Sequence, residues 1–227
     1  YSMDGTETNI SEYVKLAKKY NALTYLDEVH AVGLYGKGGR GVAFKNDVSN
    51  QIDIINGTLA KGFGQIGGYI VADQTTVDFV RSFASGFIFT TSMMPSVAAA
   101  ATKSIEIVEH LDKERLDIFN KAKYFKQKLK ILDIPFIDSE SHIIPILTHE
   151  TSRAKLFSRL LLDQYNSYIQ PIFYPTVPEG SARLRITITP KHSIKDIDEL
   201  IASLKRLFDS ESSEQAMTLK ARQNQVA

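Results

Sequence analysis

The chain has 227 residues, 43% of them hydrophobic, which is enough to bury the core of one large domain or two small ones. Its 27 basic and 26 acidic side chains nearly cancel, so no overall field favours nucleic acid or an anionic membrane, and small-molecule chemistry is the expectation. The absence of cysteine excludes disulfides, thiolate nucleophiles and cysteine metal sites, and no apolar run reaches the ~18 residues that span a bilayer.

Hydrophobic periodicity over the first two thirds of the chain alternates between helical and extended segments, as in an α/β domain. In chain order, the pattern predicts a helix over 11–20, a buried strand over 22–26 that ends at Asp27, strands over 52–55 and 68–72, and helices over 75–85, 96–110 and 113–131. A break near Leu111 is expected to separate the last two helices.

From His142 onward the order changes to strand, helix, strand and helix, which predicts a small second domain. Its expected elements cover residues 143–147, 152–165, 183–188 and 194–208. The end of the chain is rich in Ser, Glu, Gln and Lys, which is typical of a mobile tail. The expected division is therefore a large domain over 1–110, a linking helix and small domain over 111–209, and a tail over 210–227.

Two carboxylates and an imidazole follow the first predicted strand, at Asp27, Glu28 and His30. Ligands bind at the carboxyl ends of strands in open α/β sheets, so this is a candidate site. In a continuous strand, Asp27 and His30 would face opposite ways, so the chain must turn directly after Asp27. The sequence DEVH also occurs in the nucleotide-hydrolysis motif of helicases. Such enzymes need the phosphate-binding loop G-x-x-x-x-G-K-[ST], which does not occur in this sequence.

A second motif, GKGGRG at residues 36–41, matches the dinucleotide fingerprint G-x-G-x-x-G by its letters. That fingerprint follows a strand directly and opens an apolar helix. Here eight residues separate Asp27 from Gly36, and residues 42–47 are a poor helix. The segment is therefore predicted to be a flexible glycine loop rather than a dinucleotide site.

Lys61 lies among small residues in NGTLAKGFG, residues 56–64, directly after a predicted strand. Small neighbours let a planar cofactor approach the backbone, and the Thr58 hydroxyl could hold a phosphate while Lys61 holds the carbon. A lysine amine attacks a carbonyl only when neutral, which desolvation or a nearby cation promotes. A protonated pyridine nitrogen needs a buried anion, which Asp27 would supply.

Three ordered segments resemble the α-oxoamine synthases of the fold-type I pyridoxal-phosphate (PLP) superfamily: YLDEVHAVGLYG (25–36), GTLAKGFG (57–64) and GGYI (67–70). The segments FIFTTS (87–92), SHIIP (141–145) and YPTVP (174–178) are most similar to the members that make 5-aminolevulinate. The resemblance runs from Tyr1 to about Leu207. It implies an α/β fold, in which part of a large PLP-binding domain with a mainly parallel sheet precedes a small α+β carboxyl-terminal domain.

The resemblance also implies the roles of the site residues. Lys61 would carry pyridoxal 5'-phosphate as a Schiff base and would remove an α-proton from glycine. Asp27 would pair with the pyridinium nitrogen, and His30 would hydrogen-bond the phenolic oxygen of the cofactor. Thr58 would bind the cofactor phosphate from the same chain.

Two further segments extend the implied site. Arg185, in RLRIT at 183–187, matches the arginine that clamps the glycine carboxylate, for which a bidentate guanidinium is suited. Arg183 shares the same face of the strand, so the choice between the two rests on the motif alone. Thr90 and Thr91 match the segment that reaches the phosphate of the neighbouring subunit's cofactor, which implies a homodimer with the active site at the subunit interface.

The implied reaction condenses glycine with succinyl-CoA and releases CoA and carbon dioxide, the first committed step of one route to haem. The family's upstream half, which supplies most contacts to succinyl-CoA, has no counterpart here, so the chain alone is expected to be inactive. Gly62 stands where many relatives have alanine and is expected to loosen the backbone beside Lys61.

Two other functions stay open on these residues. One is another α-oxoamine synthase, such as glycine C-acetyltransferase, because the choice of acyl-CoA depends largely on the upstream half. The other is a non-catalytic subunit of this fold, although such a subunit would be expected to lose Lys61. Frequent Lys, Ile and Asn without a targeting segment suggest a bacterial cytoplasmic enzyme, or a mitochondrial matrix enzyme if the source is eukaryotic.

Overall fold

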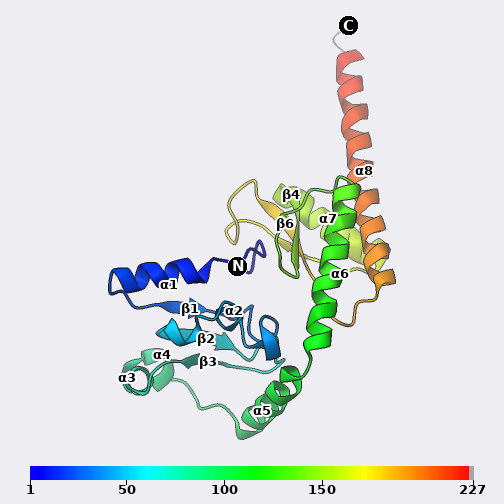
Figure 1. The fold of residues 1–227 in the computed structure, drawn as a ribbon. Coiled ribbons are helices and arrows are strands. Elements are labelled where there is room, and N and C mark those ends of the chain that lie inside the picture. The colour runs from blue at the N-terminus through cyan, green and yellow to red at the C-terminus, as the bar shows by residue number, and fades with distance from the viewer. Residues whose placement is uncertain (225–227) are drawn as a thin grey trace. The chain divides into compact units, whose positions relative to one another are not determined.

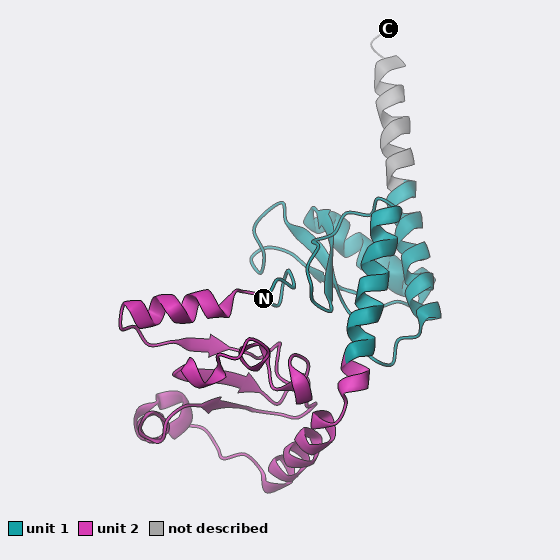
Figure 2. Cartoon of the chain, viewed as in Figure 1, with its two compact units in different colours: residues 1–7, 116–227 teal, residues 8–115 magenta. Residues whose placement is uncertain are grey.

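The structure is a computed structural model that describes residues 1–224, with side chains described up to Ser210. The chain forms two compact units, which Figure 2 colours separately. Unit 1 contains residues 1–7 and 116–227, and unit 2 contains residues 8–115. The first seven residues therefore belong with the carboxyl-terminal unit.

Unit 2 is built on a three-stranded sheet of order β1-β2-β3 (Figure 1). Strands β1 and β2 are parallel, with Asp27 opposite Asn56, whereas β2 and β3 are antiparallel. The elements of this unit are α1 (Ile10–Lys19), β1 (Tyr25–Asp27), η1 (Lys37–Gly39), α2 (Val42–Lys45), η2 (Ser49–Gln51), β2 (Ile54–Thr58), β3 (Gly68–Val71), α3 (Gln74–Phe83), α4 (Ser85–Ile88) and α5 (Pro95–Glu109).

The core of unit 2 lies between α1 and one face of this sheet. Ile10 and Val14 are one helical turn apart and are both buried, which places the apolar stripe of α1 on the core. They pack in one cluster with buried Ala31, Val42, Ala43 and Val48 and with partly buried Leu26, Tyr35, Ile52 and Ile55. Burial of this stripe explains why the amphipathic pattern predicted α1 correctly.

The prediction of a buried strand over 22–26 is wrong in both position and burial. Strand β1 begins only at Tyr25, and Leu23 and Tyr25 are 83% and 63% exposed. Because β1 is at the edge of this sheet and alternate side chains face opposite sides, only Leu26 reaches the core cluster. An apolar run therefore does not establish burial on both faces.

Unit 1 contains a second three-stranded sheet of order β4-β6-β5, in which both pairings are antiparallel. Its strands are β4 (Ile143–His149), β5 (Gln170–Ile172) and β6 (Ala182–Thr187), and its helices are α6 (Asp112–Ile131), which begins in unit 2, α7 (Thr151–Tyr165) and α8 (Ile194–Asn224). Helix α7 contacts all three strands and α8. Of the side chains described, the largest that are fully buried lie here, and they include Phe125, Leu129, Ile144, Ile146, Leu161, Leu184 and Leu204.

The four predicted elements of this second sheet and its helices are present, and one strand was missed. Strand β5 has three residues and contains Pro171, so its sequence carries too little alternation to be recognised. The predicted mobile tail over 210–227 lies, beyond Ser210, outside the residues whose side chains are described.

The predicted break near Leu111 is confirmed, since α5 ends at Glu109 and α6 begins at Asp112. The buried guanidinium of Arg115 donates to the carbonyls of Val108 and Glu109 at 2.6 and 3.2 Å, so it satisfies groups that the end of α5 leaves without partners. It also bonds the Asp112 carboxylate at 2.6 Å. This bond, followed by one from the Gly38 N–H, lowers the pKa of Asp112.

Candidate cofactor site

The carboxyl ends of the parallel strands β1 and β2 lie side by side in unit 2. Asp27 ends β1 and is paired with Asn56 of β2, and β2 ends two residues later at Thr58. The next N–H, that of Glu28, donates to the Asn56 carbonyl at 2.8 Å. The predicted residues Asp27 and Thr58 therefore project from the same edge of the sheet, which is where ligands bind in such sheets.

The chain turns directly after Asp27, as the spacing to His30 requires. The Asp27 carboxylate accepts the N–H of Val29 at 2.9 Å, and the Glu28 carbonyl accepts the N–H groups of Ala31 and Val32 at 2.8 and 3.0 Å. These bonds form a compact turn that carries the half-buried imidazole of His30.

Lys61 lies in the nine-residue connection between β2 and β3, residues 59–67. The connection is closed by a bond from the Leu59 N–H to the Gly67 carbonyl at 2.9 Å. The Thr58 hydroxyl donates to the same carbonyl at 3.2 Å and accepts the N–H of Ala60 at 3.1 Å. Thr58 thus stabilises the start of the lysine loop, a contact that the sequence did not indicate. The side chain of Lys61 itself is exposed.

The lysine loop packs against the turn that follows Asp27. A Cβ atom built on Gly62 would lie 2.7 Å from the Val32 carbonyl oxygen and 3.3 Å from the Cα of Gly33. Both distances are shorter than ordinary van der Waals contact, so only glycine fits without a local shift. Gly62 therefore has a packing role that the sequence did not indicate, because it allows this close approach beside Lys61.

The glycine loop at residues 36–41 lacks the context of a dinucleotide site. It follows the turn after Asp27 rather than a strand, contains the short helix η1, and leads into α2, which has only four residues. Four of its glycines have positive φ, between 67° and 101°. This conformation is one that other residues rarely adopt, so the glycines are explained by the shape of the loop.

Thr90 and Thr91 follow α4 in unit 2, and both are exposed. The N–H of Thr90 lies 3.4 Å from the Phe87 carbonyl, which ends the helical turn. The described structure contains one chain, so the expected contact of these threonines with a neighbouring subunit stays a prediction. Phe89 beside them is 86% exposed.

Arg183 and Arg185 lie on the central strand β6 of unit 1 and differ in their contacts. Arg183 is buried, and it donates to the carbonyls of Ser181 and Met3 at 3.0 and 3.2 Å. Burial lowers the pKa of Arg183, although the negative charge of Asp4 opposes this.

Arg185 is half-buried and donates through Nη1 to the Ser2 carbonyl at 3.2 Å. Its Nε atom is buried without a hydrogen-bond partner among the described residues. A buried guanidinium donor without an acceptor is costly, so this atom is suited to an incoming anion such as a carboxylate. The structure therefore distinguishes the two arginines, which the sequence pattern did not.

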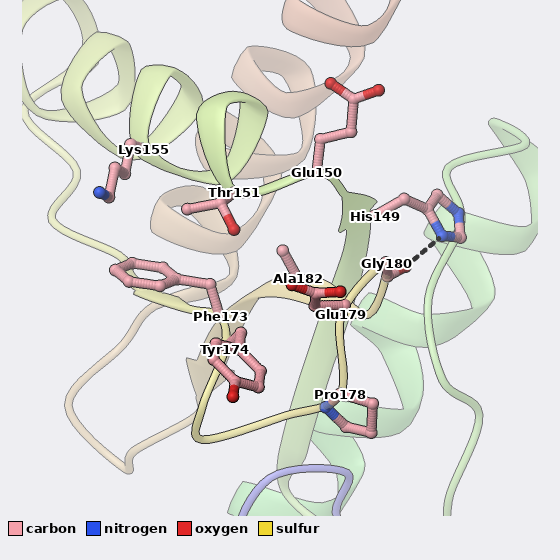
Figure 3. A pocket seen from close by; sticks show the side chains of 10 residues that line it. All are labelled: His149, Glu150, Thr151, Lys155, Phe173, Tyr174, Pro178, Glu179, Gly180 and Ala182. Carbon is pink, nitrogen blue, oxygen red and sulfur yellow. Dashed lines mark hydrogen bonds between the residues drawn. The ribbon is translucent and has the colours of Figure 1, made fainter.

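Unit 1 also contains a separate cavity of about 490 Å³ (Figure 3). Its wall combines the start of α7 with the loop before β6, and the lining residues are His149, Glu150, Thr151, Lys155, Phe173, Tyr174, Pro178, Glu179, Gly180 and Ala182. The Lys155 ammonium lies 4.7 Å from the centre of the Phe173 ring. None of the predicted site residues is among these ten.

The residues of unit 2 fit PLP in their chemistry. An exposed lysine amine, a carboxylate and a threonine hydroxyl come from two adjacent strand ends, and Gly62 adds no side chain next to Lys61. The carboxylate of Asp27 is exposed, so the expectation of a buried anion at this position is wrong, because Asp27 ends an edge strand. Among the described residues there is no cluster of three or more metal-binding side chains and no helix long and apolar enough to cross a membrane.

The family model of class I and II aminotransferases matches residues 1–204. The chain belongs to this family. The predicted α/β fold and the PLP cofactor of the family are thereby confirmed. Solved relatives include a serine palmitoyltransferase from S. paucimobilis with a bound PLP–myriocin aldimine, at a TM-score of 0.86 and 29% identity, covering 92% of this chain and 53% of that one. The serine palmitoyltransferase of Sphingomonas wittichii has a TM-score of 0.87 at 26% identity, with coverages of 94% and 54%.

Several curated proteins that match this chain are named 5-aminolevulinate synthase. The protein of Rickettsia prowazekii is 48% identical over 209 residues, which are 92% of this chain and 50% of the relative. The protein of Rhizobium meliloti is 46% identical over 211 residues, with coverages of 92% and 52%. The chain therefore spans about half the length of the curated relatives that it matches.

Proposed function

We propose that this chain is part of a PLP-dependent acyltransferase that condenses glycine with succinyl-CoA to 5-aminolevulinate, CoA and carbon dioxide, a step of haem biosynthesis. Relatives with the name 5-aminolevulinate synthase, at 46% to 48% identity over 92% of the chain, support this assignment. Because the chain spans about half of their length, the proposal concerns the intact protein, and the chain alone is expected to be inactive.

In the proposed site, PLP supplies an electron sink next to the α-carbon of glycine. Lys61 holds the cofactor through its amine and later accepts the glycine α-proton. Asp27 keeps the pyridine nitrogen protonated, and His30 hydrogen-bonds the phenolic oxygen. Thr58 would bind the phosphate through its hydroxyl, which in this structure donates to the Gly67 carbonyl; that carbonyl also accepts the Leu59 N–H.

The contact of Gly62 with Val32 and Gly33 carries the proposal. It joins the loop of Lys61 to the turn that follows Asp27, so two segments that are about 30 residues apart form one site. This juxtaposition is what a cofactor requires when a lysine binds one side of its ring and a carboxylate pairs with its nitrogen.

The remaining assignments concern the assembly. Thr90 and Thr91 of one subunit bind the phosphate of the neighbouring subunit's cofactor, and the protein is a homodimer with its active site at the interface. The matching curated relatives named above are bacterial, which supports a cytoplasmic location. The proposed substrates are the small molecules glycine and succinyl-CoA, and nucleic acid is not among the proposed partners.

The choice of acyl-CoA tests the proposed reaction. The intact protein is incubated with glycine and succinyl-, acetyl- or palmitoyl-CoA, and the release of CoA is measured. We expect kcat/KM for succinyl-CoA to exceed the other two by at least about 10²-fold, because a site built to pair a carboxylate rejects a substrate that lacks it. A preference for acetyl-CoA would contradict the proposal in favour of glycine C-acetyltransferase.

Arg185 and Arg183 are distinguished by conservative substitution. We expect Arg185→Lys to raise KM for glycine by about tenfold to 10²-fold, because lysine cannot form the bidentate pair with a carboxylate. Arg183→Lys should leave this KM within about twofold but lower the melting temperature, because Arg183 is buried and bonded to Ser181 and Met3. The reverse result in steady-state kinetics would transfer the carboxylate-binding role to Arg183.

A further inference from the structure

Glu28, which lies between Asp27 and His30, is a buried carboxylate that the proposed reaction does not use. Only 2% of its surface is exposed. Its Oε2 and Oε1 atoms accept the N–H groups of Val42 and Ala43 at 2.7 and 2.8 Å. A charge-assisted pair of this kind compensates for the burial of the carboxylate, which would otherwise be costly.

The glycine loop at residues 36–41 is shaped around this carboxylate. Gly41 has φ +101°, and a Cβ atom built on it would lie 2.4 Å from Oε2 of Glu28. At Gly39, a Cβ atom would lie 2.8 to 2.9 Å from the backbone of Gly33, whose N–H donates to the Gly39 carbonyl at 2.7 Å. The loop thus connects Glu28 at one end with Gly33 at the other.

Glu28 and Gly33 each lie next to a residue of the proposed cofactor site. The carbonyl of Glu28 closes the turn of His30, as described above, and its N–H extends the pairing of β1 with β2. At the other end, Gly33 contacts Gly62, the residue next to Lys61, with a Cβ-to-Cα distance of 3.3 Å for a Cβ built on Gly33. The side chain of Glu28 therefore bonds the first residues of α2, directly after the loop whose Gly39 packs on Gly33.

We propose that Glu28 is a positioning residue, which uses its two bonds to Val42 and Ala43 to hold the glycine loop and thereby sets His30 and Lys61 in place for PLP. This inference rests on the proposed cofactor site. It gives the glycine motif a structural function in the site instead of dinucleotide binding.

The negative charge of Glu28 also affects the phenol of Tyr69. The half-buried phenol of Tyr69 lies on β3 with its ring against Gly57, where a Cβ atom would meet the Cζ atom at 2.4 Å. Burial raises the pKa of Tyr69, and the negative charge of Glu28 raises it further. The carboxylate of Glu28 therefore adds to the effect of burial at Tyr69 of β3.

Two variants test the positioning role of Glu28 by changing either the carboxylate or the backbone segment that it contacts. Glu28→Gln keeps the size of the side chain, but it turns one acceptor into an N–H₂ group that faces a backbone N–H. Gly41→Ala keeps the carboxylate but places a methyl group on it. Glu12→Gln, on the exposed side of α1, and Gly86→Ala, where a Cβ atom meets nothing within 4 Å, are the matched controls.

The intact protein is titrated with PLP, and three quantities are measured: the dissociation constant, the midpoint pH of the visible absorbance of the lysine-bound cofactor, and the melting temperature of the cofactor-free protein. We expect each variant to weaken PLP binding by about tenfold or more and to shift the midpoint pH, since a charge-assisted bond is lost. The double variant should be no weaker than the single ones, because both act on one contact. The controls should match the unmodified protein.

Three results would overturn the inference. The first is a lower melting temperature with unchanged PLP affinity and midpoint pH, and the second is additive losses in the double variant. The third is failure of the cofactor-free variants to fold, because Glu28 would then be needed for folding rather than for positioning. If the unmodified protein binds no PLP, the proposed function fails instead, which is a distinct result.

Discussion

Substitution of Lys61 with alanine is expected to abolish covalent binding of PLP and to lower kcat/KM of the intact protein by about 10³-fold or more. Lys61 is exposed on the loop between β2 and β3, where its amine can reach a ligand at the edge of the sheet. Alanine removes both the covalent attachment and the base for the glycine α-proton. Visible absorbance of the purified protein and steady-state kinetics measure the two losses.

Lys103→Ala is the matched control for this prediction. Lys103 is exposed on α5 and pairs with Glu106 at 3.0 Å, so its loss should leave absorbance and activity unchanged, as is usual for a surface ion pair. Borohydride reduction followed by peptide mapping locates the attachment directly. A cofactor label on any lysine other than Lys61 would refute the central assignment.

Substitution of Asp27 with asparagine is expected to lower kcat by about 10²-fold or more while the protein still binds PLP. The amide has nearly the same shape and keeps an oxygen to accept the Val29 N–H, so the turn after β1 should persist. It carries no negative charge, however, and cannot keep a pyridine nitrogen protonated. Kinetics and the absorbance spectrum of the bound cofactor check this result.

Asp53→Asn provides the comparison, because Asp53 is another carboxylate of unit 2 that accepts a backbone N–H, that of Thr24 at 2.7 Å. Its replacement should affect stability but not kcat. If the two variants lose activity equally, the effect of Asp27 would be structural, and its pairing with the cofactor would have to be abandoned.

Helices with a strong apolar stripe were predicted well from the sequence, whereas strands were predicted less well. The periodicity located α1, α3, α5, α6 and α7 to within about two residues at their ends, because the spacing of apolar residues is a property of the helix itself. Strand burial depends on which neighbours pair with a strand. That information is not local, so β1 was expected to be more buried than it is, and β5 was missed.

The sequence predicted which residues form the candidate site, but it did not predict the residues that pack against them and hold them in place. Motif resemblance selected Lys61, Asp27, His30, Thr58, Thr90, Thr91 and Arg185. The first six of these belong to unit 2, and Arg185 belongs to unit 1. Glu28 was read only as part of a polar strand end, and Gly62 as a minor departure. Their roles depend on contacts with residues that are distant in sequence, which no local pattern encodes.

The sequence by itself predicted the family, its cofactor and a candidate lysine through motif resemblance, and it predicted the order of most elements through periodicity, because motifs and periodicity are properties of short segments. Only the tertiary structure decided three other points: the burial of Glu28 beside the glycine loop, the close approach of Gly62 to Gly33, and the Nε of Arg185, which, unlike that of Arg183, has no hydrogen-bond partner among the described residues. Burial, close backbone contact and hydrogen-bond satisfaction arise only when segments meet in space.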